Sequence, residues 1–270
     1  MQHKYIQPDV FTKIASQKKT WLVTGGAGFI GSHLVETLLS AGQTVRILDN
    51  FSSGKIENLK NVESIVGFEA WKNFKLIDAD IRNLSNCLEA TEGVDYVLHH
   101  AAMGSVPASI KDPQLCHQIN VVGSQNMLQA SLQNKIKKFV FATTAAIYGN
   151  NPDSPKQENF KPDILSPYAE SKLQNEKDAQ SFFQTHGLNC VGFRYFNVFG
   201  PRQDPNGSYA SVIPNWINLI KNLKPVTVFG DGLQTRDFCH VSQIVQVNLR
   251  AILNESPQLS GEFFNIGLGQ

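Results

Sequence analysis

The stretch Trp21-Leu-Val-Thr-Gly-Gly-Ala-Gly-Phe-Ile-Gly31 determines the fold that we expect for this chain. It begins as a short apolar strand and continues into glycines spaced Gly25-x-x-Gly28-x-x-Gly31, overlapped by Gly26-x-Gly28-x-x-Gly31. Gly25 permits a tight turn, Gly28 lets backbone amides approach a diphosphate, and Gly31 lets the next helix pack close to the strand. Because the helix N-terminus adds a partial positive charge, this strand–turn–helix stretch predicts a dinucleotide-binding site.

Beyond this turn, short β-branched or aromatic runs alternate with longer helical patterns. Strands separated by helices favour right-handed βαβ units and one parallel sheet with helices on both faces. We therefore predict an α/β fold, a Rossmann-type doubly wound parallel sheet. The expected strands are 21–24, 44–49, 74–77, 95–99, 139–142 and 190–195, and the expected helices are 30–40, 85–91, 113–134 and 167–186.

The character of the sequence changes after Phe196. Turn-forming residues crowd 200–207, and they are followed by an expected helix at 212–221, strand at 226–229, helix at 241–253 and strand at 262–266. We interpret this part as a smaller substrate lobe interleaved with the first domain. The dinucleotide-binding domain is expected over 1–196 plus about 233–255, and the substrate lobe over 197–232 plus 256–270. Because the chain stops just after a strand, we expect the lobe to be truncated.

Composition excludes several classes of protein. The chain has 270 residues, of which 41% are hydrophobic, so it can form a sizeable core. Its 24 Lys+Arg against 23 Asp+Glu give a net charge of +1, which excludes a broad attraction to nucleic acid or an anionic membrane. No apolar run reaches the roughly 18 residues of a transmembrane helix, and residues 1–20 lack the apolar core of a secretory signal. Cys87, Cys116, Cys190 and Cys239 show no metal-site spacing, so we expect reduced thiols in a cytoplasmic protein without a metal.

Asp49 ends the second expected strand, 18 residues after Gly31. A carboxylate at this place accepts hydrogen bonds from both ribose hydroxyls of NAD and repels the 2′-phosphate of NADP. We therefore favour NAD as the cofactor, although Lys55 lies nearby in the sequence. Asp80-Ile81 follows the third strand, where it can meet the adenine, with a surface aspartate as the alternative.

A second pattern, Tyr168-Ala-Glu-Ser-Lys172, opens a helix after Ser166-Pro167. Its Tyr and Lys, at i and i+4, share one helix face, although an ordinary surface face shows the same spacing. A free phenol has a pKa of about 10 and a good general base one of about 7, so the change requires roughly 4 kcal/mol. The Lys172 ammonium and an oxidised nicotinamide both have the charge that stabilises a phenolate. We therefore predict that Tyr168 is a general base and that Lys172 assists it.

A third pattern, Phe141-Ala-Thr-Thr-Ala-Ala-Ile-Tyr-Gly149, follows the fifth expected strand. Ligands bind at the carboxyl ends of parallel strands in this architecture. A hydroxyl there can hold a substrate oxygen and relay its proton to Tyr168. On chemistry alone, Thr143 and Thr144 serve equally well.

Together these motifs resemble the extended short-chain dehydrogenase/reductase family over residues 18–270. The resemblance assigns the catalytic hydroxyl to Thr144, four residues before Tyr148-Gly149, and the base and its helper to Tyr168 and Lys172. The cofactor-binding residues that it implies are Gly25, Gly28, Phe29, Ile30, Gly31, Asp49, Asn50, Ser53, Gly54, Asp80, Ile81, Ala101, Ala102, Asn120, Tyr168, Lys172 and Tyr195.

Further stretches are similar to one branch of that family, the bacterial UDP-N-acetylglucosamine 4-epimerases and UDP-hexosaminuronate 4-epimerases. They are His99-His-Ala-Ala-Met-Gly-Ser-Val-Pro107, Arg194-Tyr-Phe-Asn-Val-Phe-Gly200, Arg202-Gln-Asp-Pro-Asn-Gly207, Tyr209-Ala-Ser-Val-Ile-Pro214, Gly230-Asp-Gly232 and Arg236-Asp-Phe-Cys239.

This second resemblance implies a UDP-sugar substrate and the residues that hold it. Arg236 would grip the diphosphate, which suits a guanidinium that can donate in pairs, with a surface ion pair to Asp231 or Asp237 as the alternative. The others are Gly104, Ser105 and Thr144 at the sugar, Asn197, Ser211, Val212 and Trp216 along the pocket, and Thr227 and Phe229 at the uracil.

The activity implied is an NAD-dependent 4-epimerisation of a UDP-hexosamine or its uronic acid through a 4-keto sugar, in surface polysaccharide biosynthesis. Dehydratases of the family carry Asp-Glu directly after the catalytic Thr, and decarboxylases resemble them in the Glu, whereas this chain has Ala145 and Ala146. Asp49 argues against an NADPH-dependent reductase. A non-catalytic dinucleotide-binding protein would be expected to lose the Tyr168/Lys172 pair, which is intact.

The resemblance also implies a homodimer, because relatives pair the helices expected at 113–134 and 167–186 with those of a second copy. Apolar residues lie on more than one face of the first of these helices. They include Val121, Met127, Leu128 and Leu132, and the alternative is that they pack on the chain's own sheet.

Overall fold

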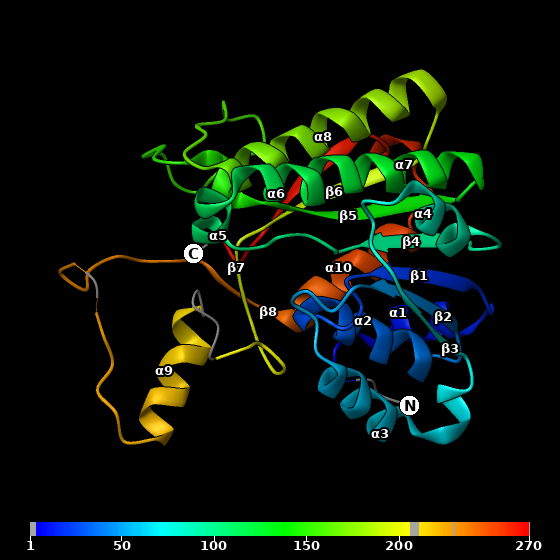
Figure 1. Ribbon diagram of the computed structural model, residues 1–270, viewed down its shortest axis with the longest axis horizontal. Helices are drawn as coiled ribbons and strands as arrows, with labels where there is room; N and C mark the ends of the chain where they lie inside the picture. The colour runs from blue at the N-terminus through cyan, green and yellow to red at the C-terminus, as the bar shows by residue number, and fades with distance from the viewer. Residues whose placement is uncertain (1–3, 206–210, 229, 270) are drawn as a thin grey trace.

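The computed structural model describes residues 4–205, 211–228 and 230–269, and its centre is a seven-stranded sheet (Figure 1). The strand order is β3-β2-β1-β4-β5-β6-β9, and every pairing in this sheet is parallel. This order is that of a Rossmann-type doubly wound sheet, so the predicted fold class is confirmed. The strands are β1 (Thr20–Thr24), β2 (Thr44–Asp49), β3 (Phe74–Asp78), β4 (Tyr96–His99), β5 (Lys138–Thr144), β6 (Cys190–Tyr195) and β9 (Glu262–Ile266).

Helices cover both faces of the sheet, which is why the central strands read as nearly continuous apolar runs. One core joins the sheet to helices α1, α2 and α10, and the other joins it to α4, α7 and α8. The bounds are α1 (Pro8–Ala15), α2 (Phe29–Ser40), α3 (Ile56–Trp71), α4 (Leu84–Thr91), α5 (Val106–Lys111), α6 (Pro113–His117), α7 (Gly123–Gln133), α8 (Pro167–His186) and α10 (Val241–Leu253).

The expected helix at 113–134 is interrupted by a π-helical turn, Gln118–Val122, between α6 and α7. The turn widens where the Asn120 backbone carbonyl accepts a hydrogen bond from Asn175 Nδ2 of α8, 2.7 Å away. Helix α3 was not predicted because Gly67 interrupts its pattern with a φ of 79°. Helices α1 and α5 were not predicted either, and each begins at or next to a proline.

The region expected to form the substrate lobe contributes to two different parts of the fold. Strand β9 pairs with β6 and so extends the main sheet, because Val191 faces Glu262 in parallel register. A two-stranded parallel ribbon joins β7 (Asn197–Phe199) to β8 (Phe238–His240). Helix α9 (Val212–Lys221) stands apart from the sheet in Figure 1, and it has no buried residue although all of it is described. The division into two domains otherwise stays a prediction.

The strand expected at 226–229 is not formed in its described part. Residues 226–228 have no regular structure and are exposed, so they have neither a partner strand nor a core to pack on. Phe229 lies outside the described residues. Short 3₁₀ turns cover Ala145–Tyr148 and Pro257–Leu259.

The loop after β7 is fastened to the first half of the sheet domain by two ion pairs. Arg202 Nη2 lies 2.6 Å from Glu36 Oε2 on α2, and both side chains are buried. Asp204 Oδ2 lies 2.7 Å from Lys55 Nζ in the loop that leads into α3, where both side chains are partly exposed. The segment that leaves the main domain is therefore held against it through Asp204.

In the described part of the chain, no helix is both long and apolar enough to cross a bilayer. Nor do the His, Cys, Asp and Glu side chains of these residues form a group of three that could hold a metal ion. The four cysteines are buried and unpaired.

Candidate active site

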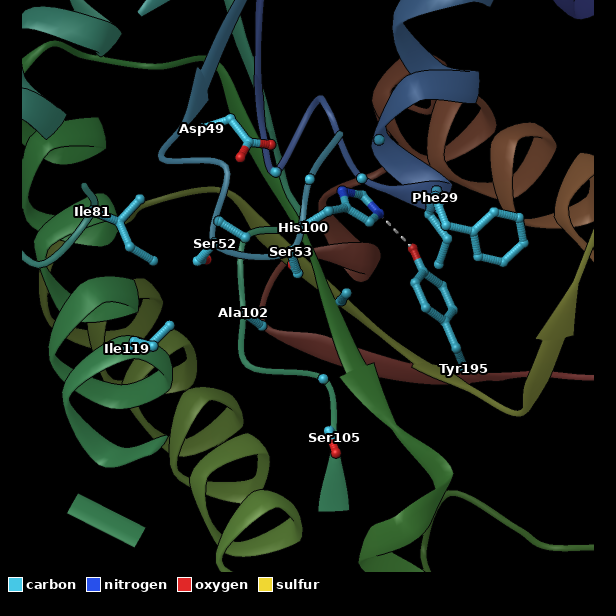
Figure 2. A pocket seen from close by; sticks show the side chains of 18 of the residues that line it. Phe29, Asp49, Ser52, Ser53, Ile81, His100, Ala102, Ser105, Ile119 and Tyr195 are labelled. Carbon is cyan, nitrogen blue, oxygen red and sulfur yellow. Dashed lines mark hydrogen bonds between the residues drawn. The ribbon is translucent and has the colours of Figure 1, made fainter. Parts of the chain in front are cut away.

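A cavity of about 520 Å³ lies at the carboxyl ends of the central strands (Figure 2). Figure 2 shows Ile81 and Ile119 on one side of it and Phe29 and Tyr195 on the other. Among the described residues, all the predicted cofactor-binding residues except Asn120 line it. Three predicted substrate-binding residues, Gly104, Ser105 and Thr144, line it as well. The fold thus gathers at one place groups that are up to 170 positions apart in the sequence.

The glycine turn forms one end of the cavity. Gly25 has a φ of +67°, and a Cβ added to Gly31 would lie 2.1 Å from the Gly25 carbonyl oxygen, so neither position accepts another residue without distortion. Helix α2 follows Gly28 without a side-chain cap, and its first turn contains no acidic residue. The first amides of a helix have no partner within it, so this N-terminus suits a diphosphate.

Asp49 lies beside the glycine turn at the end of β2. Its Oδ2 accepts a hydrogen bond from Ala27 N, and its Oδ1 accepts one from Phe51 N, each at 2.9 Å. Burial raises the pKa of Asp49, and these two backbone donors oppose that rise. A carboxylate oxygen has more than one lone pair, so both can still accept ribose hydroxyls. Together with the turn, this geometry fits NAD.

Asp80 lines the cavity but is also paired within the chain. Arg82 donates to both of its carboxylate oxygens, and Asn50 Nδ2 donates to Oδ2 at 2.8 Å. These donors, with Arg82 first, lower the pKa of Asp80 to about 2. Asp80 therefore lines the cavity and also forms an ion pair with Arg82, so the two interpretations of this residue do not exclude each other.

Tyr168 and Lys172 lie at the other end of the cavity, on one face of α8. Ser166 caps the helix by accepting a hydrogen bond from Ala169 N at 3.2 Å, and Pro167 occupies the first turn. Lys172 Nζ donates to the Ala142 carbonyl of β5 at 3.0 Å. These contacts fix the helix against the end of β5.

The pKa values of Tyr168 and Lys172 show how far the chain's own groups activate the phenol. Burial raises the pKa of Tyr168 above its usual 10, and a hydrogen bond with Thr144 opposes that rise. Burial also lowers the pKa of Lys172 from 10.5 to about 8, so its ammonium is itself destabilised. The chain's own groups therefore leave Tyr168 protonated at neutral pH, and a further positive charge at the site is needed to form a phenolate.

The structure separates the roles of Thr143 and Thr144, which the sequence left open. Thr143 Oγ1 donates to Glu176 Oε1 at 2.8 Å, so its proton is already engaged within the chain. Thr144 Oγ1 accepts from Ala146 N at 3.1 Å and is hydrogen-bonded to Tyr168. The geometry thus favours Thr144 as the hydroxyl next to the base.

His100 lines the cavity and was missed by the sequence reasoning. Its Nε2 is 3.0 Å from the Tyr195 hydroxyl, as the dashed line in Figure 2 shows, and Asn248 Nδ2 donates to the same hydroxyl at 2.7 Å. Burial lowers the pKa of His100 to about 4, so the ring is neutral. Its place in His99-His100 beside Ala101 was the available signal. The other missed lining residues are Leu48, Ser52, Ala79, Ile119, Ala142, Phe196, Val198 and Gln203.

Asn120 acts one layer behind the cavity wall. Its Oδ1 accepts from Met103 N at 2.7 Å, and its Nδ2 donates to the Met103 carbonyl at 3.1 Å. It therefore holds the loop that presents Gly104 and Ser105 to the cavity. Asn120 itself is not among the described residues that line the cavity.

A second cavity of about 900 Å³ adjoins the first and shares Thr144, Tyr195 and Phe196 with it. Asn197 and Arg236 line this second cavity. In the described part of the chain, Arg236 forms no ion pair with Asp231 or Asp237. The remaining predicted substrate residues that are described line neither cavity: they are Ser211, Val212, Trp216 and Thr227.

These features define an enzyme built to use NAD, and comparison with known proteins gives its class. The chain belongs to the NAD dependent epimerase/dehydratase family, whose sequence model matches residues 21–267. A putative UDP-glucose 4-epimerase of Methanocaldococcus jannaschii is 38% identical over 251 residues, which are 92% of this chain and 77% of that protein.

Two solved structures are similar at the level of the whole fold. A UDP-N-acetylglucosamine 4-epimerase from Methanobrevibacter ruminantium M1, in complex with UDP-N-acetylmuramic acid, has a TM-score of 0.87 and 39% identity, over 94% of this chain and 78% of that one. A UDP-glucuronic acid 4-epimerase from Bacillus cereus, in complex with UDP-glucuronic acid and NAD, has a TM-score of 0.81 and 34% identity, over 92% and 77%. The enzyme is thus NAD-dependent and of the nucleotide-sugar epimerase type.

Proposed function

We propose that this enzyme inverts C4 of a UDP-activated N-acetylhexosamine or of the corresponding uronic acid. The observation that carries the proposal is the position of Thr144 and Tyr168. Thr144 lines both the cavity that fits NAD and the second cavity lined by Asn197 and Arg236, and Tyr168, which lines the first cavity, is hydrogen-bonded to Thr144. A sugar held between the two cavities would present its C4 hydroxyl to both side chains.

The residues that would hold NAD follow the length of the first cavity. The amides at the start of α2 would bind the diphosphate, Asp49 the adenosine ribose, and Asp80-Ile81 the adenine. Lys172 and Tyr195 would border the nicotinamide riboside. When bound, NAD supplies reversible oxidation of the sugar at C4. Its oxidised form also brings the positive charge that is needed to stabilise the phenolate of Tyr168.

The chain's own groups move a proton. Thr144 would hold the 4-oxygen, and the phenolate of Tyr168 would accept the hydroxyl proton as the 4-keto sugar forms. After the sugar has turned in the pocket, Tyr168 would return the proton to the same oxygen. The cycle therefore consumes no net oxidant and no net base.

UDP recognition is assigned to residues around the second cavity. Arg236 is exposed there and can donate in pairs to a diphosphate. The roles of Ser211, Val212, Trp216, Thr227 and Phe229 follow from the resemblance of the sequence to UDP-sugar epimerases. The place in polysaccharide biosynthesis stays a prediction on the same ground.

The site lacks the carboxylates that dehydratases and decarboxylases of the family carry directly after the catalytic Thr. Ala145 and Ala146, which directly follow Thr144, line the second cavity and carry no carboxylate. Among the described residues that line either cavity, the carboxylates are Asp49, Asp80 and Asp237, and each already accepts hydrogen bonds from the chain. Among the described residues, the one carboxylate that shares a cavity wall with Ala145 and Ala146 is therefore Asp237, which already accepts hydrogen bonds from Leu268 N.

The homodimer also stays a prediction. Met127 and Leu128 pack in the chain's own core, whereas Val121 is buried but lies outside that core and Leu132 is only partly buried. The surface left for a second copy is a groove of about 410 Å³ between the π-helical turn and α8, lined among others by His117, Val121 and Glu170.

The proposal is tested by NMR of the sugar after incubation of the enzyme with UDP-N-acetylglucosamine, its uronic acid or UDP-glucose. We expect UDP-N-acetylglucosamine or its uronic acid to give a mixture of C4 epimers, and the opposite epimer to reach the same mixture, whereas conversion of UDP-glucose alone would contradict the proposed substrate. A 4-keto-6-deoxy sugar or a pentose as the product, or no conversion of any of the three, would contradict it.

A further inference from the structure

Helix α8 contacts the end of β5 at three points that share one helix face. Tyr168, Lys172 and Glu176 are spaced at i, i+4 and i+8. They are hydrogen-bonded, in that order, to Thr144, to the carbonyl of Ala142 and to Thr143. All three contacts reach residues that line the first cavity, but in the third the helix residue, Glu176, lies behind the cavity wall.

The third contact is anchored by a buried ion pair. Arg194 of β6 donates from Nε to Glu176 Oε1 at 3.0 Å and from Nη2 to Oε2 at 2.7 Å. The exposed fractions of the two side chains are 8% and 4%, so the pair is shielded from water. Glu176 Oε1 therefore receives both Arg194 and the Thr143 hydroxyl in a fixed geometry.

The same arginine extends the network toward the substrate side. Its Nη1 donates to the Tyr148 hydroxyl at 2.8 Å and to the Glu158 carbonyl at 2.9 Å. Tyr148 in turn donates to Asn265 Oδ1 at 2.7 Å, and Asn265 lines the second cavity. The network thus joins that cavity's wall to the residue next to Thr144.

We infer that Glu176, held by Arg194, is a positioning residue that fixes Thr143 and thereby keeps the Thr144 hydroxyl aligned with Tyr168. The inference rests on the proposed function, in which Thr144 and Tyr168 share the substrate proton. A buried ion pair adds little stability over an apolar pair of the same volume, because desolvation offsets its attraction. A fixed geometry at the end of β5 is therefore the benefit that this pair provides.

The sharpest test is Thr143→Val, which removes the hydroxyl and leaves the ion pair intact. We expect kcat to fall by about 10-fold, because misplacement of a catalytic group by a fraction of an ångström already slows a reaction. KM for the UDP-sugar should stay within about 2-fold, since Thr143 makes no substrate contact in the proposed mechanism. Thr143→Ser, which restores the hydroxyl, should restore kcat.

A pH profile distinguishes positioning from loss of packing. The Thr144 hydrogen bond lowers the pKa of Tyr168, so loosening that bond should move the acid limb of kcat to higher pH. Thr91→Val is the matched control, because Thr91 is also fully buried and its hydroxyl donates within α4 to the Cys87 carbonyl. The control should change neither kcat nor the profile.

A second readout is independent of turnover. In NAD-bound protein with ¹³Cζ-tyrosine, assigned through Tyr168→Phe, we expect the pKa of Tyr168 to rise in Thr143→Val and to return in Thr143→Ser. If the wild-type protein failed to epimerise UDP-sugars, the proposed function would be wrong, but the pKa of Tyr168 could still be compared between the variants. The positioning role is wrong if Thr143→Val leaves both the Tyr168 resonance and kcat unchanged, or if Thr143→Ser does not rescue them.

Discussion

Lys172 on α8 donates a hydrogen bond from Nζ to the backbone carbonyl of Ala142 on β5, 3.0 Å away. The lysine is 3% exposed, so one carbonyl dipole takes the place of most of its hydration shell. That exchange is unfavourable for an ammonium, and it explains why the pKa of Lys172 falls to about 8. Burial of the Lys172 ammonium at the active site therefore lowers the stability of the NAD-free fold.

The first prediction follows from that cost. A pKa lowered from 10.5 to about 8 means that the charged lysine destabilises the NAD-free fold by roughly 3 kcal/mol below pH 8. This penalty disappears as the pH rises to 10.5, because the folded protein then holds a neutral amine. We expect Lys172→Met to raise the Tm of NAD-free protein at pH 7, and the difference to vanish near pH 10.5.

Lys177→Met is the control for that experiment, since Lys177 is exposed on the same helix and its removal should leave Tm nearly unchanged. Scanning calorimetry at several pH values gives the comparison. A Lys172→Met protein that is less stable than wild type at pH 7 would show that the burial penalty is not what the structure indicates.

The second prediction concerns the base. Tyr168→Phe keeps the ring and its packing but removes the oxygen that accepts the proton. We expect kcat for epimerisation to fall by at least about 10²-fold, the lower range for loss of general base catalysis. NAD and UDP should bind nearly as in the wild type, because neither depends strongly on that oxygen.

Tyr96→Phe, at the opposite end of the sheet, should retain full activity and serves as the matched variant. Thr144→Val should also slow the reaction more than it weakens binding, and more than Thr143→Val does. The assignment of Tyr168 must be given up if Tyr168→Phe epimerises UDP-sugars at the wild-type rate, and that of Thr144 if the order of the two valine variants is reversed.

The third prediction is cofactor preference. Asp49 offers carboxylate oxygens to the cavity, so we expect wild-type protein to bind NAD⁺ more tightly than NADP⁺ in calorimetric titrations. Asp49→Ala should narrow that preference. Asp78, which faces Asp49 across the β2–β3 pairing but is not among the residues lining the cavity, provides the control Asp78→Ala. Tighter binding of NADP⁺ by the wild type would overturn the assignment.

The fourth prediction tests the role of α9. If the resemblance assigns Trp216 correctly, UDP should change its fluorescence, because the indole is only partly shielded before UDP binds. Trp216→Phe should abolish most of that change and weaken UDP binding. Trp71→Phe, whose ring stacks on Phe74 away from the cavity, should leave the change intact. A full signal in Trp216→Phe would remove this residue from the UDP site.

Much of the fold could be predicted from local patterns. The glycine turn and α8, which runs over Pro167–His186 as expected, follow from backbone sterics and capping within a few residues. The π-helical turn at Asn120 could not, because it depends on a hydrogen bond from Asn175, 55 positions away. The choice between Thr143 and Thr144 depends likewise on Glu176, whose carboxylate no local pattern connects to β5.

The two ion pairs of the loop after β7 mark the boundary between the buried sheet domain and an exposed segment. Arg202 and Asp204 keep the start of the loop on the sheet domain through Glu36 and Lys55. Beyond them, the described residues 211–228 include none that is buried. Substitutions in that segment therefore leave the packing around Tyr168 intact while they change the residues proposed to bind UDP, so substrate preference can change there without loss of the folded catalytic domain.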